Sequence, residues 1–254
     1  MSDATSLAQL TSQRYRELVC YPRFTEEEFQ RRIKELKSLG VKALRLTGSK
    51  HLLDLRVLGK GHSSVVVMAI IGRGQRCALK VRRLDSGKPD TSHEVAMLAR
   101  ANSVGVGPHL LGQTANFLLM ELIEGPMLDE WICNLKGRER RQQLKRALRT
   151  ILEQCRSLDG LGLDHGELSR ATKHILVRGD HPFIIDFEKS SLGRRASNVT
   201  SVCQYLFIGG KAASKVRRLL GEVDRRLLLG SLQQYKTEQN DENFRKILSV
   251  LTLL

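Results

Sequence analysis

Apolar and polar residues follow a helical spacing near the start of the chain. Residues 25–40 read TEEEFQRRIKELKSLG and repeat apolar side chains every three or four positions. Thr25 and Glu28 have the spacing of a helix-starting capping box, and Gly40 is a typical stop. We therefore predict an amphipathic helix over this segment.

From about residue 42 the pattern changes to short aliphatic runs separated by glycine-containing turns. Such runs are typical of antiparallel strands. The pattern predicts three strands, a helix and two further strands around a turn at 113–116: strands 52–58, 64–71 and 76–83, helix 91–103, and the two strands within HLLGQTANFLLMELIEG. Five strands and one helix indicate a small, sheet-rich lobe.

After Gly125 helical spacing dominates. The segment RERRQQLKRALRTILEQCRSL places five apolar side chains on one helical face, namely Leu144, Leu148, Ile151, Leu152 and Cys155. Short apolar runs at 175–177 and 183–185 predict two strands, and ASNVTSVCQYLF, AASKVRRLLGEVDRRLLLGSL and ENFRKILSVLTLL are helical in pattern. We expect an α+β protein with an N-terminal helical segment (1–48), a sheet-rich lobe (49–124) and a mainly helical lobe (125–254).

Composition allows a sizeable core and favours anionic partners. The chain has 254 residues, of which 41% are hydrophobic. It carries 42 basic and 27 acidic side chains, a formal net charge of +15. Such a charge suits RNA or nucleotides, although a solvated arginine-rich surface explains it equally well.

Cysteine usage and the N-terminal sequence bear on the compartment. The five cysteines are an odd number without C-x-x-C spacing, which argues against a disulfide framework or a zinc site. The start MSDATSLAQL lacks a basic region followed by an apolar core, and no apolar run approaches the roughly 18 residues of a membrane span. We expect a cytoplasmic protein without a membrane partner.

Two features of the sheet-rich lobe suit phosphate binding. Gly59 and Gly61 lie on a turn between strands, where glycine lets backbone N–H groups approach a phosphate, although an ordinary hairpin turn would look the same. Lys80 alternates with Leu79 and Val81, so its side chain leaves the opposite face of the strand. An inward lysine there could pair with phosphates, whereas an isolated lysine more often faces solvent.

Glu94 has two interpretations. It could pair with Lys80 and fix the direction of the lysine, or it could form a capping box with Thr91 at the start of the predicted helix.

The stretch LDHGELSRATKHILVRGDHPFIIDFEKSS, residues 163–191, carries two separated carboxylates. Glu167 follows a histidine by two positions, and Asp186 follows the second predicted strand. Phosphoryl transfer uses one carboxylate to orient the acceptor hydroxyl and another to hold the cation that bridges the phosphates. Polar residues in turns explain either carboxylate alone, but their order behind Gly59 and Lys80 favours chemistry.

This order of motifs resembles that of protein-kinase-like phosphotransferases, most of all the RIO-like and archaeal-type predicted serine/threonine kinases. The resemblance covers roughly residues 50–210. HGEL is similar to the HGDL of RIO-like kinases, GKG followed by serine is similar to their phosphate loop, and IIDFE is also similar to the choline-kinase and aminoglycoside-phosphotransferase families. The resemblance implies a two-lobed fold with a shortened helical C-terminal lobe, ATP, and Mg²⁺ or Mn²⁺.

The resemblance also implies roles for individual residues. The catalytic residues would be Glu167, Lys80 and Asp186. Nucleotide binding would fall to Gly59, Gly61, Ser64, Val66, Ala78, Lys80, Glu94, Met120, Glu121 and Ile123. The metal would be held by Asp186 together with either Thr172 or His174.

The chain departs from that family in three ways. Glu167 is one methylene longer than the usual aspartate, and a misplacement of about 1 Å can cost on the order of a hundredfold in rate. Thr172 and His174 replace the usual asparagine; because imidazole suits softer metals, we expect Mn²⁺ to support activity at least as well as Mg²⁺. No A-P-E sequence follows Glu188, which leaves the acceptor unidentified.

The sequence leaves three functions open. The first is transfer of the γ-phosphate of ATP to a protein hydroxyl, including one of its own; the second is a nucleotide-binding pseudokinase or ATPase-like switch; the third is a small-molecule kinase. An RNA or ribonucleoprotein partner would use basic helix faces, formed by Arg138, Arg140, Arg141, Lys145, Arg146, Arg149, Arg217, Arg218, Arg225 and Arg226.

Overall fold

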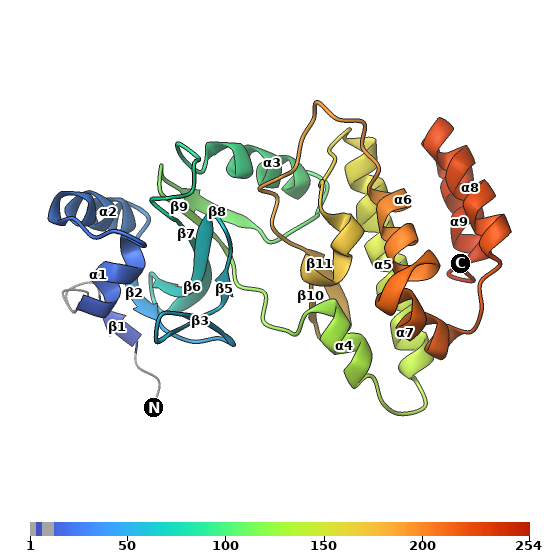
Figure 1. The fold of residues 1–254 in the computed structure, drawn as a ribbon, viewed down its shortest axis with the longest axis horizontal. Helices are drawn as coiled ribbons and strands as arrows, with labels where there is room; N and C mark the ends of the chain where they lie inside the picture. Colours follow the sequence, from blue (N-terminus) through green and yellow to red (C-terminus); the bar gives the residue numbers. More distant parts are fainter. Residues whose placement is uncertain (1–3, 7–12) are drawn as a thin grey trace. The chain divides into compact units, whose positions relative to one another are not determined.

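The computed structural model describes residues 4–6 and 13–254, which divide into two compact units (Figure 1). Unit 1 runs to Ala96 and includes His109–Leu122, and unit 2 consists of Met97–Pro108 and Ile123–Leu254. Most of the segment MSDATSLAQL lies outside the described residues. In the described ranges, no helix combines the length and the apolar content that crossing a membrane requires.

Unit 1 is built on an antiparallel sheet in the order β1-β2-β6-β7-β9-β8, with β5 paired to β6. The strands of unit 1 are β1 (Ala4–Ser6), β2 (Val41–Arg45), β3 (Lys50–Leu52), β4 (Leu55–Val57), β5 (Gly59–Lys60), β6 (Ser64–Ile71), β7 (Gln75–Arg82), β8 (Leu110–Gln113) and β9 (Phe117–Glu121). Strands β3 and β4 form a separate two-stranded sheet. Its helices are α1 (Gln13–Val19), α2 (Glu26–Ser38) and the first part of α3 (Ser92–Asn102).

The α+β class and several predicted elements are confirmed. Helix α2 begins after Thr25, whose hydroxyl accepts a hydrogen bond from the Glu28 N–H at 3.3 Å, and β6, β7, α3, β8 and β9 lie within two residues of the predicted ranges. The N-terminal segment, however, is not purely helical, because β1 and β2 add two strands to the sheet. The five residues of β2 were too few to stand out after the helix.

The predicted single strand at 52–58 is wrong. The chain reverses there, and β3 and β4 form a short hairpin in which Leu52 pairs with Leu55. Leu53 lies at the turn with φ 53° and is 57% exposed, whereas Leu52 and Leu55 are buried. A continuous aliphatic run hid the turn, because one of its leucines does not enter the core.

Helices α1 and α2 cover one face of the sheet. One face, with Val65, Val67 and Leu79, packs with α1 and α2 into the core of unit 1. Phe29 and Leu36 of α2 are 3% and 0% exposed in that core. Truncation to alanine costs about 3–5 kcal/mol for Phe29 and about 2–5 kcal/mol for Leu36. The N-terminal helices are thus part of the fold of unit 1.

Arg32 of α2 is fully buried and cross-links this unit. Its guanidinium donates to the Val19 carbonyl at 2.6 Å, the Arg82 carbonyl at 2.8 Å and the Asn116 side-chain oxygen at 2.9 Å. It also pairs with Glu28 at 2.6 Å. A buried charge persists only when it is paired and hydrogen-bonded, which these contacts provide.

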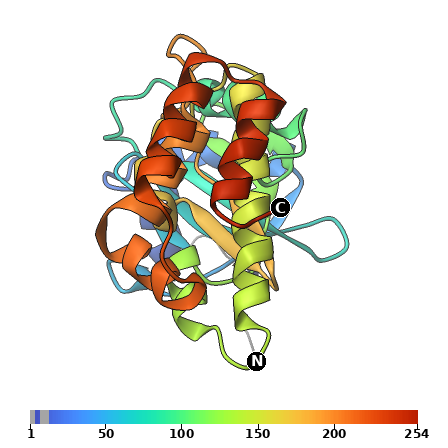
Figure 2. The same cartoon turned by 90° about the vertical axis from the view of Figure 1, so that its right-hand side faces the viewer.

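Unit 2 is mainly helical. Its elements are α4 (Leu128–Asn134), α5 (Arg140–Gly160), the 3₁₀ helix η2 (Leu168–Lys173), β10 (Ile175–Arg178), β11 (His181–Ile184), α6 (Asn198–Cys203), the π-helical turn η3 (Gln204–Ile208), α7 (Gly210–Leu220), α8 (Arg225–Thr237) and α9 (Asp241–Val250). Helices α8 and α9 lie side by side in Figure 2. The predicted apolar stripe of α5 is confirmed, since all five side chains are at most 1% exposed.

The long helical pattern at 212–232 is divided in the structure. Helix α7 ends at Gly221, which has φ 95°, and α8 starts after Asp224, whose carboxylate accepts from the Leu227 N–H at 3.0 Å. Glycine at a helix end and aspartate at a helix start are ordinary boundary residues, and the helical spacing on both sides concealed them.

Candidate functional site

Five of the predicted nucleotide-binding residues lie on one face of the sheet of unit 1. In the strand registers Gly59 lies opposite Val66, Val66 opposite Lys80, and Ala78 opposite Met120. Because directly paired residues of antiparallel strands share a face, and Ala78 is two positions from Lys80, all five point to the same side. The face opposite to them is the one covered by α1 and α2.

Lys80 is buried and paired. Its side-chain nitrogen lies 2.7 Å from a carboxylate oxygen of Glu94, and the two residues are 6% and 9% exposed. The solvent-facing alternative for Lys80 is therefore wrong. Of the two interpretations of Glu94, the structure contains the pairing with Lys80, while the hydroxyl of Thr91 donates to the Thr114 carbonyl at 2.7 Å.

The glycine turn is held by an arginine that the sequence did not point to. The Gly61 N–H donates to the Ser64 carbonyl at 2.8 Å, which closes the turn. Arg83 donates from its side chain to the Gly61 carbonyl at 3.1 Å, and its backbone N–H donates to the Ser63 carbonyl at 2.8 Å. Ser64 is 7% exposed at the start of β6.

The residues predicted to contact adenine belong to different units: Met120 and Glu121 to unit 1 and Ile123 to unit 2. The backbone N–H of Glu121 donates to the His109 carbonyl at 2.8 Å inside unit 1, so that group is already used. Ile123 is 7% exposed and belongs to unit 2.

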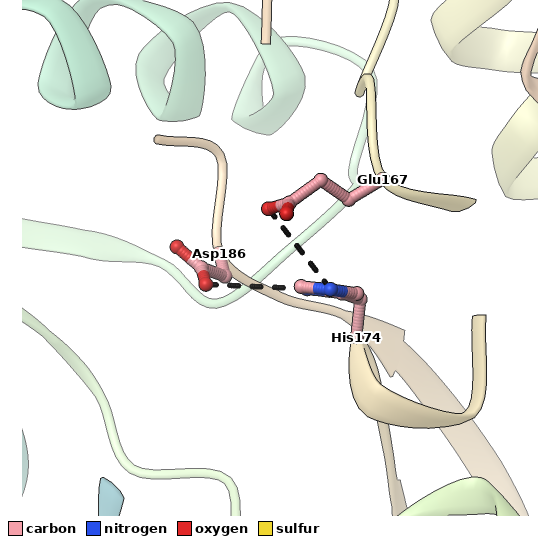
Figure 3. Close-up of side chains that lie close together, drawn as sticks. All are labelled: Glu167, His174 and Asp186. Carbon is pink, nitrogen blue, oxygen red and sulfur yellow. Dashed lines mark ion pairs between the residues drawn. The ribbon is translucent and has the colours of Figure 1, made fainter. Parts of the chain in front are cut away.

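Unit 2 brings Glu167, His174 and Asp186 together (Figure 3). A nitrogen of His174 lies 4.0 Å from a Glu167 oxygen, and its other ring nitrogen lies 3.9 Å from an Asp186 oxygen. Glu167 immediately precedes η2, His174 follows it, and Asp186 comes after β11. The Ile185 N–H donates to the His174 carbonyl at 2.9 Å and joins the two segments that carry the cluster.

The structure separates the two candidates for the second metal ligand. The hydroxyl of Thr172 lies 2.7 Å from that of Tyr205, and Thr172 is 8% exposed. Thr172 is not in the cluster, because η2 turns it toward η3, and its assignment as a metal ligand is not supported by this geometry. The Nδ1 atom of His174 is buried without a hydrogen-bond partner and is close to Asp186.

A divalent cation fits this cluster chemically. One ligand atom from each of Glu167, His174 and Asp186 lies within 4.8 Å of the other two. Carboxylates suit Mg²⁺ and Mn²⁺, whereas imidazole suits transition metals, so this mixed donor set favours a transition metal over Mg²⁺. Groups of acidic residues also occur in proteins without a metal. The geometry therefore identifies the residues that could act as ligands and does not show that a metal binds.

Asp186 has an unusual backbone. Its φ is 70°, in the left-handed region that non-glycine residues seldom adopt. Such conformations cost of order 1–3 kcal/mol and cluster at functional sites. Asp186 adopts this backbone conformation while one of its carboxylate oxygens lies 3.9 Å from Nδ1 of His174 (Figure 3).

The loop before Glu167 is positioned by buried groups that the sequence did not point to. The His165 N–H donates to the Asn198 side-chain oxygen at 2.9 Å, and the Asn198 amide nitrogen donates to Asp159 at 2.8 Å. Asp159 also accepts from the Tyr235 hydroxyl at 3.0 Å. Their only sequence trace is polar residues inside helical segments, which is common on exposed faces.

His165 itself is a structural group. It is fully buried, packs against Phe187 with ring centroids 5.1 Å apart, and has Nε2 3.1 Å from the Ile185 carbonyl. Burial lowers the pKa of His165 to about 4, so the ring is neutral near pH 7. A neutral ring donates from Nε2 to that carbonyl, which orients the loop that carries Glu167.

Two cations lie beside Glu167. Lys189 is 3.0 Å from the Glu167 carboxylate, and Arg194 pairs with Asp164 at 2.8 Å. Gly166 has φ 83°, and a Cβ there would lie 2.5 Å from an Arg194 nitrogen and 2.8 Å from the Lys189 carbonyl. Only glycine therefore fits between these groups.

Comparison with known proteins identifies an archaeal relative. No family model matches the chain. An uncharacterized protein of Methanocaldococcus jannaschii, MJ1211, is 30% identical over 101 residues, which span 40% of this chain and 83% of that protein.

Proposed function

The chain belongs to the family of this uncharacterized archaeal protein, and from its own residues we propose that it is an ATP-dependent phosphotransferase of the protein-kinase-like type. The reaction would transfer the γ-phosphate to a serine or threonine hydroxyl. The observation that carries the proposal is the buried Lys80–Glu94 pair, at 2.7 Å, on the sheet face that also bears Gly59 and Val66. Lysine side chains are almost never fully buried unless they are paired. A buried lysine–glutamate pair on this face of the sheet therefore favours a functional reason for the pair.

A second observation supports the same function from unit 2. Glu167, His174 and Asp186 converge, and Asp186 is held in a left-handed conformation. Phosphoryl transfer needs a positioned carboxylate and a cation ligand, and these residues supply both. The division into a sheet-based unit 1 and a mainly helical unit 2 supports the proposal.

In the proposed reaction, each residue has one task. Lys80 binds oxygens of the nucleotide phosphates, while Glu94 holds its ammonium group in place. Glu167 accepts a hydrogen bond from the acceptor hydroxyl, whose oxygen forms a bond to the γ-phosphorus as the bond to the ADP oxygen breaks. The hydroxyl proton passes to Glu167 or to the phosphate. A divalent cation held by Asp186 and His174 would neutralise phosphate charge.

Glutamate in place of aspartate is compatible with this chemistry. Catalysis of phosphoryl transfer depends mainly on positioning and charge neutralisation, and less on the strength of the base. The Lys189 contact at 3.0 Å fixes the longer Glu167 side chain, which offsets part of its extra freedom.

The test is incorporation of labelled γ-phosphate by the wild type and by Lys80→Ala and Asp186→Ala. We expect each substitution to reduce transfer at least a hundredfold, because each removes a charge that the transition state requires. The measurement is made with Mg²⁺ and with Mn²⁺ at equal concentrations, and Mn²⁺ should be at least as effective. Lys136→Ala, which removes an exposed lysine, is the control and should leave the rate unchanged.

Two outcomes would redirect the proposal. Thermal stabilisation by ATP without transfer to any acceptor would make the protein a nucleotide-binding switch. ATP consumption that depends on a hydroxylated metabolite would favour the small-molecule kinases to which IIDFE is similar. Transfer that is unchanged in both site variants would remove the assignment of Lys80 and Asp186.

A further inference from the structure

Two exposed cations lie beside Glu167, and each is paired with a carboxylate. Lys189 pairs with Glu167, and their side chains are 65% and 22% exposed. Arg194 pairs with Asp164, and these side chains are 51% and 12% exposed. In each pair the carboxylate is inside and the cation outside. A molecule approaching Glu167 therefore meets an ammonium and a guanidinium group, together with the Asp186 carboxylate, whose side chain is 39% exposed.

Arg194 is hydrogen-bonded to the backbone of Lys189. A guanidinium nitrogen of Arg194 donates to the Lys189 carbonyl at 2.6 Å, and its Nε donates to Asp164 at 2.8 Å. The backbone of Asp164 in turn exchanges hydrogen bonds with Ser191 at 2.9 and 2.8 Å. The segment 189–194 is thus fastened to the loop that carries Glu167.

Two further exposed cations, Arg170 and Lys173, lie in η2, which directly follows Glu167. The Arg170 N–H donates to the Glu167 carbonyl at 2.9 Å, which places Arg170 one 3₁₀ turn after Glu167. The backbone departs from helical angles at Arg170, with φ −129° and ψ 44°, so helical spacing does not place the Lys173 side chain relative to Glu167. Arg170 and Lys173 are both exposed. We call Arg170, Lys173, Lys189 and Arg194 the basic rim.

The rim lacks the features of a nucleic-acid site. Proteins that bind single-stranded nucleic acid stack bases on aromatic side chains. In residues 164–174 and 187–197 the rings are His165, His174 and Phe187, whose exposures are at most 12%. No exposed ring is therefore available in these segments, and the exposed chemistry is ammonium and guanidinium groups.

We propose that the basic rim selects the acceptor: a serine or threonine of an acidic protein segment, whose carboxylates or phosphates pair with the rim while the hydroxyl meets Glu167. The inference rests on the proposed phosphotransferase activity and names its substrate class. Flexible acidic segments suit such a rim, because several weak surface pairs add up only when the charges of both partners are arranged to match.

The experiment compares three synthetic peptides of equal length, each with a single serine flanked by aspartates, alanines or lysines. Transfer of labelled γ-phosphate is measured for the full chain with Mn²⁺. We expect kcat/KM for the aspartate peptide to exceed that for the alanine peptide at least tenfold, and the lysine peptide to be poorest. Raising the salt concentration should reduce the difference, since exposed charges are screened.

Two variants assign the preference to the rim. Arg170→Glu and Lys173→Glu reverse charges without removing the contacts of Glu167, and each should reduce the preference for the aspartate peptide severalfold, through KM. Arg226→Glu, an exposed arginine of α8, makes the same charge change elsewhere and should leave the preference intact. ATP hydrolysis without peptide should stay at the wild-type rate in all three variants.

Several results would overturn the inference. Equal kcat/KM for the three peptides would do so, as would transfer to a terminal hydroxyl of an RNA oligonucleotide in place of the peptides. Self-phosphorylation without transfer to any peptide would also contradict it, while leaving the proposed function standing. Absence of every transfer, together with no effect of Lys80→Ala on nucleotide binding, would remove both.

Discussion

Single backbone positions around Glu167 carry constraints that their neighbours do not. Gly166 and Asp186 both have left-handed φ values, of 83° and 70°. Glycine adopts that region freely, whereas aspartate adopts it at a cost in conformational free energy. Gly166 needs glycine for a second reason, because Arg194 and the Lys189 carbonyl occupy the space of a side chain.

Gly166→Ala tests this constraint. We expect it to lower the stability of unit 2 by about 2–4 kcal/mol, combining left-handed strain with displacement of Arg194. Phosphate transfer should fall at least tenfold, because the loop that positions Glu167 moves. The measurements are thermal unfolding and labelled transfer.

Gly162→Ala is the matched control for that variant. Gly162 has φ 68°, but no atom lies within 4 Å of the added carbon. It should pay only the left-handed penalty of about 1–2 kcal/mol and retain full transfer. Equal losses of transfer in the two variants would contradict the role given to the contact of Gly166 with Arg194 and Lys189.

At the scale of elements, one short helix positions the loop that carries Glu167. Asn198, the first residue of α6, accepts from the His165 N–H and donates to both Asp159 and the Leu163 carbonyl. Burial raises the pKa of Asp159 in this network, since its carboxylate is removed from solvent. Helices α5 and α6 and the Glu167 loop are therefore joined through one asparagine.

Asn198→Ala should separate these elements. It leaves the buried His165 N–H and part of Asp159 without partners, which costs about 1–3 kcal/mol for each group. Transfer should fall along with stability. Asn240→Ala removes a helix cap from α9, where Asn240 accepts from the Asn243 N–H at 2.8 Å, and should cost about 1 kcal/mol without changing transfer. Full activity of Asn198→Ala at a temperature where it is folded would argue against the positioning role.

The sequence predicts the long elements well and the short ones poorly. Helices α2 and α5 repeat their apolar spacing over several turns, so both are found with correct buried faces. The hairpin of β3 and β4 has three residues in each strand, which is too short for a pattern.

The site follows the same division. Lys80 stands out in the sequence because it is a charged residue within an apolar strand, and Asp186 stands out because it follows a strand directly. The choice between Thr172 and His174 depended on a kink in η2 at Arg170, where the backbone departs from helical angles. Asp159, Asn198 and Tyr235 meet only in three dimensions, from positions up to 76 residues apart, so local patterns could not reveal them.

At the scale of the whole molecule, part of the positive charge is used internally. Four basic residues of α5 have partners within unit 2: Arg141 donates to the Leu220 carbonyl, Lys145 to the Thr252 carbonyl, Arg146 pairs with Asp180 and Arg149 with Glu153. These contacts explain some of the arginine-rich sequence without RNA. An RNA partner stays a prediction, carried by the exposed Arg138, Arg140, Arg218, Arg225 and Arg226.

Thiol labelling checks the fold of both units at once. Cys133 is exposed, whereas Cys20, Cys77, Cys155 and Cys203 are buried. Burial raises the pKa of Cys20 to about 11 and raises that of the other three, which withholds the reactive thiolate. We expect one thiol to react quickly with a disulfide reagent in the native protein and all five in denaturant.

Cys133→Ser should abolish the fast reaction and serves as the control. A second thiol reacting at a comparable rate would show that one unit is less closed than its core indicates. Mass spectrometry of the labelled peptides would identify that unit, because Cys20 and Cys77 belong to unit 1 and Cys155 and Cys203 to unit 2.

The buried guanidinium of Arg32 also sets an order of events during synthesis on the ribosome. Its acceptor on Asn116 lies 84 residues further along the chain. At about 5–20 residues per second, α2 emerges roughly 4–17 s before that partner exists. Throughout that interval the guanidinium of Arg32 stays hydrated, and the sheet against which the apolar face of α2 packs is incomplete. We therefore expect unit 1 to close only after β9 has left the ribosome, with the apolar face of α2 exposed until then.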